Sequence, residues 1–356
     1  MSNDNNSRCV NAIAPIRICD IGGWTDTWFA KNGAVLNFAV YPQVEVQVNS
    51  KKSCNNGSIT INAENYGDKY VYKSVSSIPN NEVDYFKHPL IEAAIDAMNI
   101  ASGPDTDYDI SIYSSAPPGA STGTSAAVSV ALIGALDKLT SNRMTAHEIA
   151  MKAHSIETDY LHLQCGVQDQ LSSAYGGINF IEMRGFPNAV VSPVKIPEQM
   201  WLELQNRIAV LYVGTPHKSS EIHQMVIESL ENNDKNRHDI LDCLSQNARD
   251  AKTALLFGDL FKFANCININ TELQKKLHPK LIGAGSEEIM RIASEYGALA
   301  AKVNGAGGDG GSVMLLFSGN RSHKRECLDE LKSRGYMHMD TPFCKEGVRT
   351  WEGIGS

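Results

Sequence analysis

Residues 117–127 read PPGASTGTSAA, and an apolar segment, Val128–Leu136, follows them without a break. Small and hydroxyl-bearing side chains let backbone N–H groups close around an anion. The start of a helix adds four unpaired N–H donors and the positive end of the helix dipole. Because Val128–Leu136 is apolar on nearly every face, we expect it to form a buried helix. The sequence therefore predicts a phosphate-binding loop that runs into a buried helix.

The hydroxyl groups of this loop argue for a bound ligand. The simpler alternative is a glycine-rich turn that only caps the helix, but a cap uses a single side-chain oxygen. A Walker A loop would place lysine after its last glycine, where this chain has Thr124, so cations for a nucleotide must come from elsewhere. The predicted phosphate-binding residues are Pro118, Gly119, Ala120, Ser121, Thr122, Gly123, Thr124 and Ser125.

Composition excludes several classes of protein. The chain has 356 residues and a net charge of −8, which argues against nucleic acid as the main partner. It contains no run of 18 apolar residues and no apolar N-terminal signal, so we expect a cytoplasmic protein without a membrane partner. The eight cysteines are scattered without a C-x-x-C pair, and we expect reduced thiols rather than a zinc site or disulfides.

The order of predicted elements indicates an α+β protein in two halves, residues 1–190 and 191–356, which meet near a polar, proline-containing stretch. A capping box at Thr145–Glu148 predicts a helix to about Gln164, with Gly166 just beyond its end. Period-two alternation in Val44–Val48 predicts a strand over 33–48. Further strands are expected at 10–18, 58–62, 70–74, 108–113, 177–183, 207–213, 298–304, 312–317 and 346–351, and helices at 89–98, 219–232, 236–256, 258–276, 285–296 and 323–334.

Arg17 is a single charge within an otherwise apolar strand. A buried charge without an anionic partner is costly, so Arg17 must have one. One interpretation is a structural pair with Asp20 or Asp26. The other is a cation directed at a transferring phosphoryl group, with Asp26 accepting hydrogen bonds from substrate hydroxyls.

Two further acids have both a structural and a catalytic interpretation. Asp169 lies in the first turn of a predicted helix, where it would favour the helix dipole or take the proton of a substrate hydroxyl. Glu157 would be a solvated acid on a helix face or a Mg²⁺ ligand. Mg²⁺ bound to nucleotide phosphates usually takes one or two protein oxygens, so Glu157 and the Ser125 hydroxyl would suffice.

Residues 305–311 read GAGGDGG and match the dinucleotide-binding pattern G-x-G-x-x-G. That pattern requires a helix after it, and here a strand is predicted to follow, so we reject the dinucleotide-binding interpretation. A glycine-rich turn between strands allows close backbone approach to another element, such as the phosphate-binding loop. The glycines expected to support the site in this way are Gly305, Gly307, Gly308 and Gly310.

Three segments, 14–26, 117–127 and 302–311, in this order and at these separations, resemble the GHMP small-molecule kinases. The resemblance implies an N-terminal domain like ribosomal protein S5, a ferredoxin-like C-terminal domain and an active site between them, with ATP and Mg²⁺ as cofactors. It implies that Asp169 is the catalytic base, that Arg17 stabilises charge, and that Ser125 and Glu157 hold Mg²⁺. The expected substrate-binding residues are Gly22, Gly23, Trp24, Thr25, Asp26 and Lys218.

Within this superfamily the first segment departs from the galactokinases, which have Glu and His where this chain has Gly23 and Trp24. Residues 22–26, 165–170 and 174–177 look most like the D-glycero-D-manno-heptose 7-phosphate kinases of bacterial surface-sugar synthesis. This implies transfer to a heptose 7-phosphate, at the anomeric hydroxyl. The L-fucose kinases, which are similar around Trp24, are the alternative. Residues 215–220, with Lys218, would bind the 7-phosphate or simply begin a helix with a solvated lysine.

Two other functions remain open. A GHMP decarboxylase of the mevalonate diphosphate type would share the fold and act on an acyclic acid. A non-catalytic sugar or nucleotide sensor would bind without turnover. Arg17, Ser125, Glu157 and Asp169 together favour an enzyme, because a pure binder needs no base. We leave open whether the protein forms a homodimer.

Overall fold

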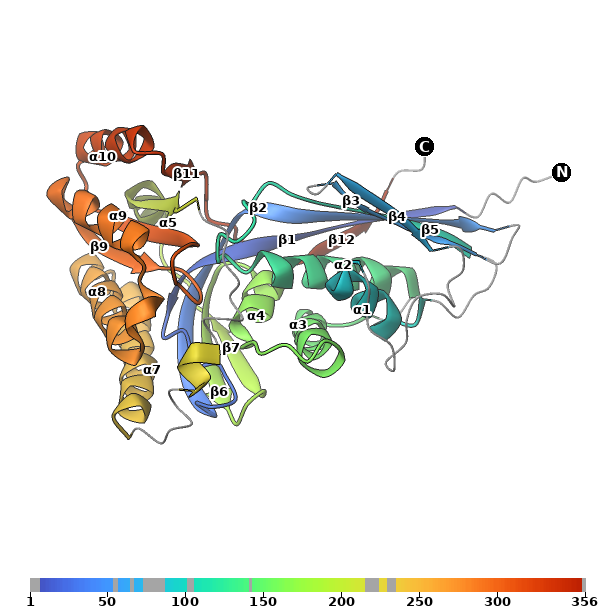
Figure 1. Cartoon of the computed structure of the whole chain (residues 1–356), viewed down its shortest axis with the longest axis horizontal. Coiled ribbons are helices and arrows are strands. Elements are labelled where there is room, and N and C mark those ends of the chain that lie inside the picture. Colours follow the sequence, from blue (N-terminus) through green and yellow to red (C-terminus); the bar gives the residue numbers. More distant parts are fainter. Residues whose placement is uncertain are drawn as a thin grey trace.

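The computed structural model describes residues 7–53, 57–64, 67–72, 87–100, 106–140, 143–214, 224–228 and 235–353. Two β-sheets lie side by side, and helices pack on both (Figure 1). The α+β class predicted from the sequence is confirmed. No helix within the described ranges is long and apolar enough to cross a membrane.

The first sheet has the strand order β12-β1-β2-β5-β3-β4, and β6 pairs with both β2 and β7. Its strands are β1 (Arg8–Ile21), β2 (Asn32–Lys52), β3 (Ile59–Ala63), β4 (Asp68–Tyr72), β5 (Thr106–Ser114), β6 (Ile178–Arg184), β7 (Ala189–Pro193) and β12 (Arg349–Glu352). The predicted alternation in β2 is confirmed: Val44, Val46 and Val48 are buried, and Glu45 and Gln47 are exposed. One face of this strand therefore belongs to the core.

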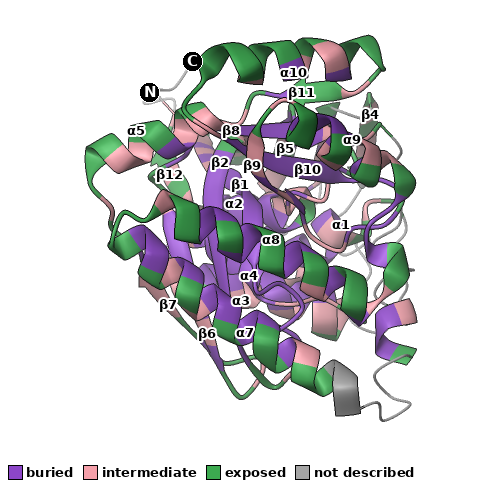
Figure 2. Cartoon of the chain, turned by 90° about the vertical axis from the view of Figure 1, so that its left-hand side faces the viewer, coloured by how far each residue is buried: buried purple, intermediate pink, exposed green. Residues whose placement is uncertain are grey.

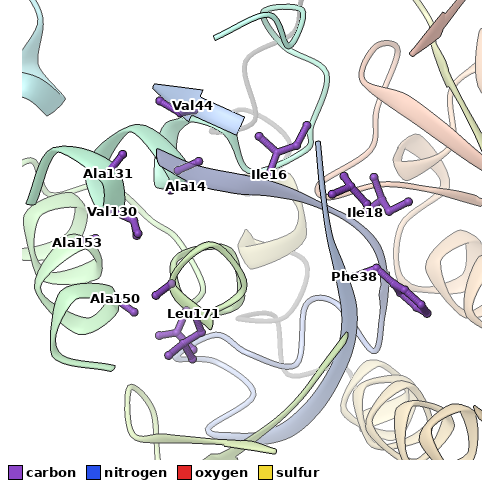
Figure 3. Close-up of a cluster of buried hydrophobic side chains, with 14 of the residues drawn as sticks. Ala14, Ile16, Ile18, Phe38, Val44, Val130, Ala131, Ala150, Ala153 and Leu171 are labelled. Carbon is purple, nitrogen blue, oxygen red and sulfur yellow. The ribbon is translucent and has the colours of Figure 1, made fainter. Parts of the chain in front are cut away.

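Four helices cover one face of the first sheet: α1 (Pro89–Ala97), α2 (Thr124–Thr140), α3 (Ala146–Ser155) and α4 (Gln168–Tyr175). Helix α2 begins within the predicted phosphate-binding loop and is buried along most of its length, as its apolar sequence predicts. Figure 3 shows part of the core between these layers, with Ala14 of β1, Val130 of α2 and Leu171 of α4. The packing fixes where α2 points its N-terminus.

The second sheet has the order β11-β8-β10-β9. Its strands are β8 (Ile208–Tyr212), β9 (Ala298–Val303), β10 (Ser312–Phe317) and β11 (Met337–Met339). The helices of this part of the chain are α5 (Glu198–Arg207), α7 (Lys235–Leu256), α8 (Leu260–Leu277), α9 (Ala284–Glu295) and α10 (Arg321–Ser333). A short 3₁₀ turn, η5 (Pro279–Leu281), follows α8. Alternate residues of β10 enter two cores: Leu315 packs with α9 and α10, and Met314 with the first sheet and α8. Figure 2 shows the exposed outer sides of α7, α8 and α10 around the buried strands.

The helix predicted from Thr145 to Gln164 is shorter than expected. The capping box at Thr145 and Glu148 is confirmed, but α3 ends at Ser155 and a π-helical turn, η4 (Ile156–Tyr160), follows. The chain then leaves the helix, and His162 adopts a left-handed φ of 52°. The prediction that Gly166 follows the helix end is therefore wrong, because the wider π-helical turn ends the helix earlier.

The expected boundary at residue 190 falls inside the β6–β7 hairpin, whose two strands both belong to the first sheet. The chain also returns to the first sheet at its other end, because β12 pairs with β1. The division into 1–190 and 191–356 stays a prediction. The helix expected at 219–232 lies mostly outside the described residues. The part of it that the structure describes, residues 224–228, is helical.

Candidate active site

The loop between β5 and α2 has the backbone shape of an anion-binding turn. Gly119, Ser121 and Gly123 adopt left-handed φ angles of 72°, 57° and 70°, and α2 begins at Thr124. The first N–H groups of a helix have no partner within the helix. Alternating left-handed residues before such a helix form a concave set of donors suited to phosphate.

Hydrogen bonds from both sheets fix this loop. The Arg17 amide donates to Thr122 O, the Ser312 hydroxyl to Ala120 O and the Tyr212 hydroxyl to Pro118 O, at 2.9, 2.7 and 3.0 Å. These loop carbonyls are therefore turned into the protein. A preformed donor set of this kind binds an anion without a large ordering cost.

A large cavity of about 790 Å³ opens in front of the loop. Its lining combines the loop with apolar side chains from other elements, among them Leu90 of α1, Ile112 of β5 and Val128 of α2. An apolar wall and a phosphate-binding loop in the same cavity suit a nucleotide, whose aromatic base would contact the wall and whose phosphates would bind the loop. The loop was predicted from the sequence, whereas this wall was not.

A small cavity of about 90 Å³ adjoins the large one. Its lining includes Arg17, Asp20, Trp24, Asp26, Glu157 and Asp169. The residues that line both cavities are Arg17, Ser125, Glu157, Cys165, Asp169, Gly305 and Ala306. A group bound in the large cavity can thus meet a group bound in the small one beside Ser125 and Asp169.

Arg17 and Asp169 form a two-pronged ion pair at this junction. Nε of Arg17 is 2.8 Å from Oδ1 of Asp169, and Nη2 is 3.0 Å from Oδ2. Burial lowers the pKa of Arg17, but the nearby carboxylates outweigh it and the net shift is upward, so the guanidinium stays charged. A Cβ on Gly123 would lie 3.1 Å from Oδ2 of Asp169, so this glycine gives the carboxylate room beside the loop. The partner of Arg17 is therefore Asp169, rather than Asp20 or Asp26.

Glu157 is buried, which contradicts its interpretation as a solvated acid on a helix face. It lies on the π-helical turn, and the Gln170 side chain donates to its Oε1 at 2.7 Å. Burial raises the pKa of Glu157 to about 7. Glu157 and Ser125 both line the small cavity, and hard oxygen donors of this kind suit Mg²⁺. The described residues contain no cluster of three or more His, Cys, Asp or Glu able to hold a metal, so nucleotide oxygens and water would complete the coordination shell.

Asp26 also lines the small cavity and is buried. Burial raises its pKa to about 6, although the backbone N–H of Gln168 donates to it at 3.1 Å. A Cβ on Gly166 would lie 2.0 Å from Oδ2 of Asp26, so only glycine leaves room for the carboxylate at this position. This close approach, and not the end of a helix, explains Gly166.

The other predicted substrate-binding residues have different positions. Trp24 lines the small cavity, whereas Gly22, Gly23 and Thr25 do not appear in its lining. The Thr25 hydroxyl donates to Gly22 O at 2.7 Å and so shapes the turn that carries Trp24 and Asp26. Lys218 lies outside the described residues.

The glycine-rich segment is a turn between antiparallel β9 and β10, as predicted. A Cβ on Gly305 would lie 2.9 Å from Ser121 O, so this turn does approach the phosphate-binding loop. Gly307 and Gly308 instead pack on Leu281: a Cβ on Gly307 would lie 2.0 Å from its oxygen, and the Gly308 amide donates to it at 3.0 Å. The glycine-rich turn thus contacts both the phosphate-binding loop and η5.

Several polar residues of the small cavity were not predicted as site residues, among them Asp20, Thr27 and Gln168. Asp20 was considered only as a partner of Arg17, yet it pairs with Lys302, and Cys165 and Gln170 were quoted only as parts of a motif. The signal for Gln170 was its position one residue after Asp169, in the first turn of α4. No local signal could have linked Asp20 to Lys302, because 282 positions separate them.

Residues 89–177 match the GHMP kinases N terminal domain, and residues 251–336 match the GHMP kinases C terminal family. The chain belongs to the GHMP kinases. It is accordingly a phosphotransferase with an alcohol group as acceptor, in a family whose phosphate donor is ATP. The sensor interpretation is thereby set aside.

Three relatives illustrate the range of this family. A D-glycero-alpha-D-manno-heptose 7-phosphate kinase from Campylobacter jejuni is 24% identical over 349 residues, 97% of this chain and 99% of the relative. A mevalonate kinase from Pyrococcus horikoshii is 30% identical over 280 residues, 76% of this chain and 78% of the relative. The crystal structure of a D-glycero-D-manno-heptose 1-phosphate kinase from Bacteroides thetaiotaomicron superposes with a TM-score of 0.74 at 24% identity, covering 98% of this chain and 100% of that one.

Proposed function

We propose that the protein transfers the γ-phosphoryl group of ATP to a heptose 7-phosphate, at the anomeric hydroxyl, in the synthesis of a bacterial surface polysaccharide. The similarity to the Campylobacter heptose 7-phosphate kinase along nearly the whole of both chains supports this proposal. So does the resemblance of residues 22–26 and 165–170 to that group of enzymes.

The charge of the small cavity is the structural observation that carries the choice of a sugar. Its described lining has four carboxylates: Asp169 is paired with Arg17 and Asp20 with Lys302, and Asp26 and Glu157 also face the cavity. A substrate carboxylate would meet like charges there, whereas hydroxyl groups would meet acceptors. This favours the hydroxyl-rich end of a sugar over mevalonate, despite the 30% identity to a mevalonate kinase.

We propose a step for each residue. The N–H groups of the loop and of α2 would bind the nucleotide phosphates, and Arg17 would stabilise charge on the transferring group. Asp169 would receive the proton of the attacking hydroxyl on a carboxylate oxygen. Ser125 and Glu157 would hold Mg²⁺, which when bound neutralises charge on the triphosphate.

Asp169→Asn should lower kcat by a factor on the order of 10²–10⁴, because the amide cannot take the proton. Steady-state kinetics with Mg-ATP would measure this, and circular dichroism would show whether the variant is folded. Near-normal turnover of the folded variant would contradict the assignment of the base.

A 7-phosphate requires cations outside the acidic small cavity. We propose residues 215–220 with Lys218 for this role, by the start-of-helix argument made from the sequence. Lys218→Ala should raise KM for the phosphorylated heptose far more than for the free heptose. An equal effect on both sugars would remove Lys218 from the phosphate site.

The experiment that tests the proposal is ADP release by the purified protein with Mg-ATP and a panel of acceptors. The panel contains D-glycero-D-manno-heptose 7-phosphate, the free heptose, D-mannose, L-fucose, D-galactose and mevalonate. We expect the highest kcat/KM for the heptose phosphate. Preference for L-fucose would identify the protein as an L-fucose kinase and leave the proposed catalytic residues unchanged. Preference for mevalonate would contradict the charge argument.

A further inference from the structure

A buried ion pair joins the two sheets beside the catalytic groups. Lys302 of β9 donates from Nζ to Oδ1 of Asp20 at 2.9 Å, and the two side chains are 0% and 2% exposed. Lys302 also donates to Val303 O at 2.7 Å. The cost of removing two charges from water can exceed their attraction, so stability alone is a weak reason for such a pair.

Asp20 has a second partner in the glycine-rich turn. Both of its carboxylate oxygens accept the backbone N–H of Gly305, each at 3.2 Å. The pairing of β1 with β2 shifts register between Ile18 and Ile21, which places Asp20 in an irregular part of the strand. A Cβ on Gly23 would lie 2.7 Å from Oδ2 of Asp20, so the next turn leaves space for this carboxylate.

Gly305 in turn contacts the catalytic junction. A Cβ there would lie 2.9 Å from Ser121 O and 3.1 Å from Nη2 of Arg17. Arg17 also donates to the same oxygen of Ser121 through Nη1. The Gly305 backbone therefore limits how far the guanidinium and the phosphate-binding loop can shift.

We infer that Asp20 and Lys302 are positioning residues for phosphoryl transfer. Lys302 fixes the Asp20 carboxylate, Asp20 fixes the Gly305 amide, and Gly305 keeps Arg17 and Ser121 in their places. A misplacement of about 1 Å at a reacting centre can cost on the order of 10²-fold in rate. The inference rests on the kinase chemistry of the family and does not depend on which sugar is the acceptor.

Two double variants separate positioning from simple charge burial. Asp20→Asn with Lys302→Met removes both charges but keeps an acceptor for the Gly305 amide. Asp20→Leu with Lys302→Met removes the charges and the acceptor. We expect kcat of the Leu variant to be lower than that of the Asn variant by roughly 10–100-fold, with a much smaller change in KM for ATP.

A matched control is Asn247→Leu, since Asn247 is also buried and donates to Cys266 O at 2.8 Å, but between α7 and α8. It should lower the melting temperature and leave kcat unchanged. The acceptor for all variants is the panel compound with the highest turnover, so failure of the heptose proposal would not decide this test. Equal kcat for the Leu and Asn variants would overturn the inference.

Amide hydrogen exchange on the unmodified protein provides a second test that needs no acceptor. The Gly305 amide should exchange slowly, because a buried carboxylate accepts its hydrogen bond. Exchange as fast as that of exposed loop amides would overturn the inference even if the Leu variant failed to fold.

Discussion

At the scale of single residues, the site contains acids whose ionisation opposes folding. Asp26 is 2% exposed, and its pKa is raised from 3.8 to about 6, chiefly by burial. Between pH 3.8 and about pH 6, Asp26 binds more protons in the folded protein than in the unfolded chain. The stability contributed by protonated Asp26 is therefore complete below pH 3.8, declines as pH rises, and is lost above about pH 6.

Asp26→Asn should remove this dependence. The amide stays neutral, so the variant should gain stability relative to the unmodified protein as pH rises through the interval, by up to roughly 3 kcal/mol at neutral pH. Urea denaturation at a series of pH values measures the difference. If the difference in free energy of unfolding between the two proteins stayed constant with pH, the raised pKa of Asp26 would be contradicted. Turnover should fall in the same variant, because Asp26 faces the small cavity.

At the scale of elements, α3 and the π-helical turn together carry Glu157 into the site. The capping box of Thr145 and Glu148 fixes the start of the helix, and the wider turn at Ile156–Tyr160 directs Glu157 toward Gln170. The start was predictable because a cap is a local pattern. The π-helical turn has no such local pattern, and the contact of its Glu157 with Gln170 comes from tertiary packing.

Thr145→Ala should lower the free energy of unfolding by about 1 kcal/mol, because the backbone N–H of Glu148 loses its acceptor. Urea denaturation would measure the loss. Thr145 is exposed and lies at the opposite end of α3 from Glu157, so kcat should stay unchanged. A fall in kcat as large as that of the catalytic variants would show that the helix start and Glu157 are coupled.

In other elements, too, features set by local sequence were predicted and features set by tertiary packing were not. The alternation in β2 and the apolar α2 were predicted from their own residues, and so was the turn between β9 and β10. Three elements, β7, α5 and β11, were not predicted, because they are short or weakly patterned. At the site, the phosphate-binding loop and the acids were recognised as motifs. Their partners, such as Lys302 for Asp20, come from tertiary packing and carry no local signal.

At the scale of the whole molecule, the chain leaves the first sheet after β7, builds the second sheet and then returns. Strand β12 pairs with the edge of β1 from Val10↔Glu352 to Ile13↔Arg349. The two ends of the described chain consequently lie on the same side of the molecule (Figure 1). The junction of the two cavities lies where the two sheets meet, with Arg17 from β1 and Gly305 from the turn after β9.

Removal of residues 349–356 should destabilise the protein by on the order of 2–4 kcal/mol, because several backbone hydrogen bonds of about 1 kcal/mol each are lost. It should also favour association through the exposed edge of β1. Thermal unfolding and light scattering would measure the two effects. An unchanged melting temperature would show that β12 contributes little to the fold.

The return of β12 also sets an order of events during synthesis. The β1 segment leaves the ribosome long before β12 does, so its outer edge receives its partner only after the whole second sheet has been made. Until then β1 presents unpaired N–H and C=O groups to the crowded interior of the cell. Folding of the first sheet is therefore completed late, and the nascent chain has a long interval in which a chaperone can protect that edge.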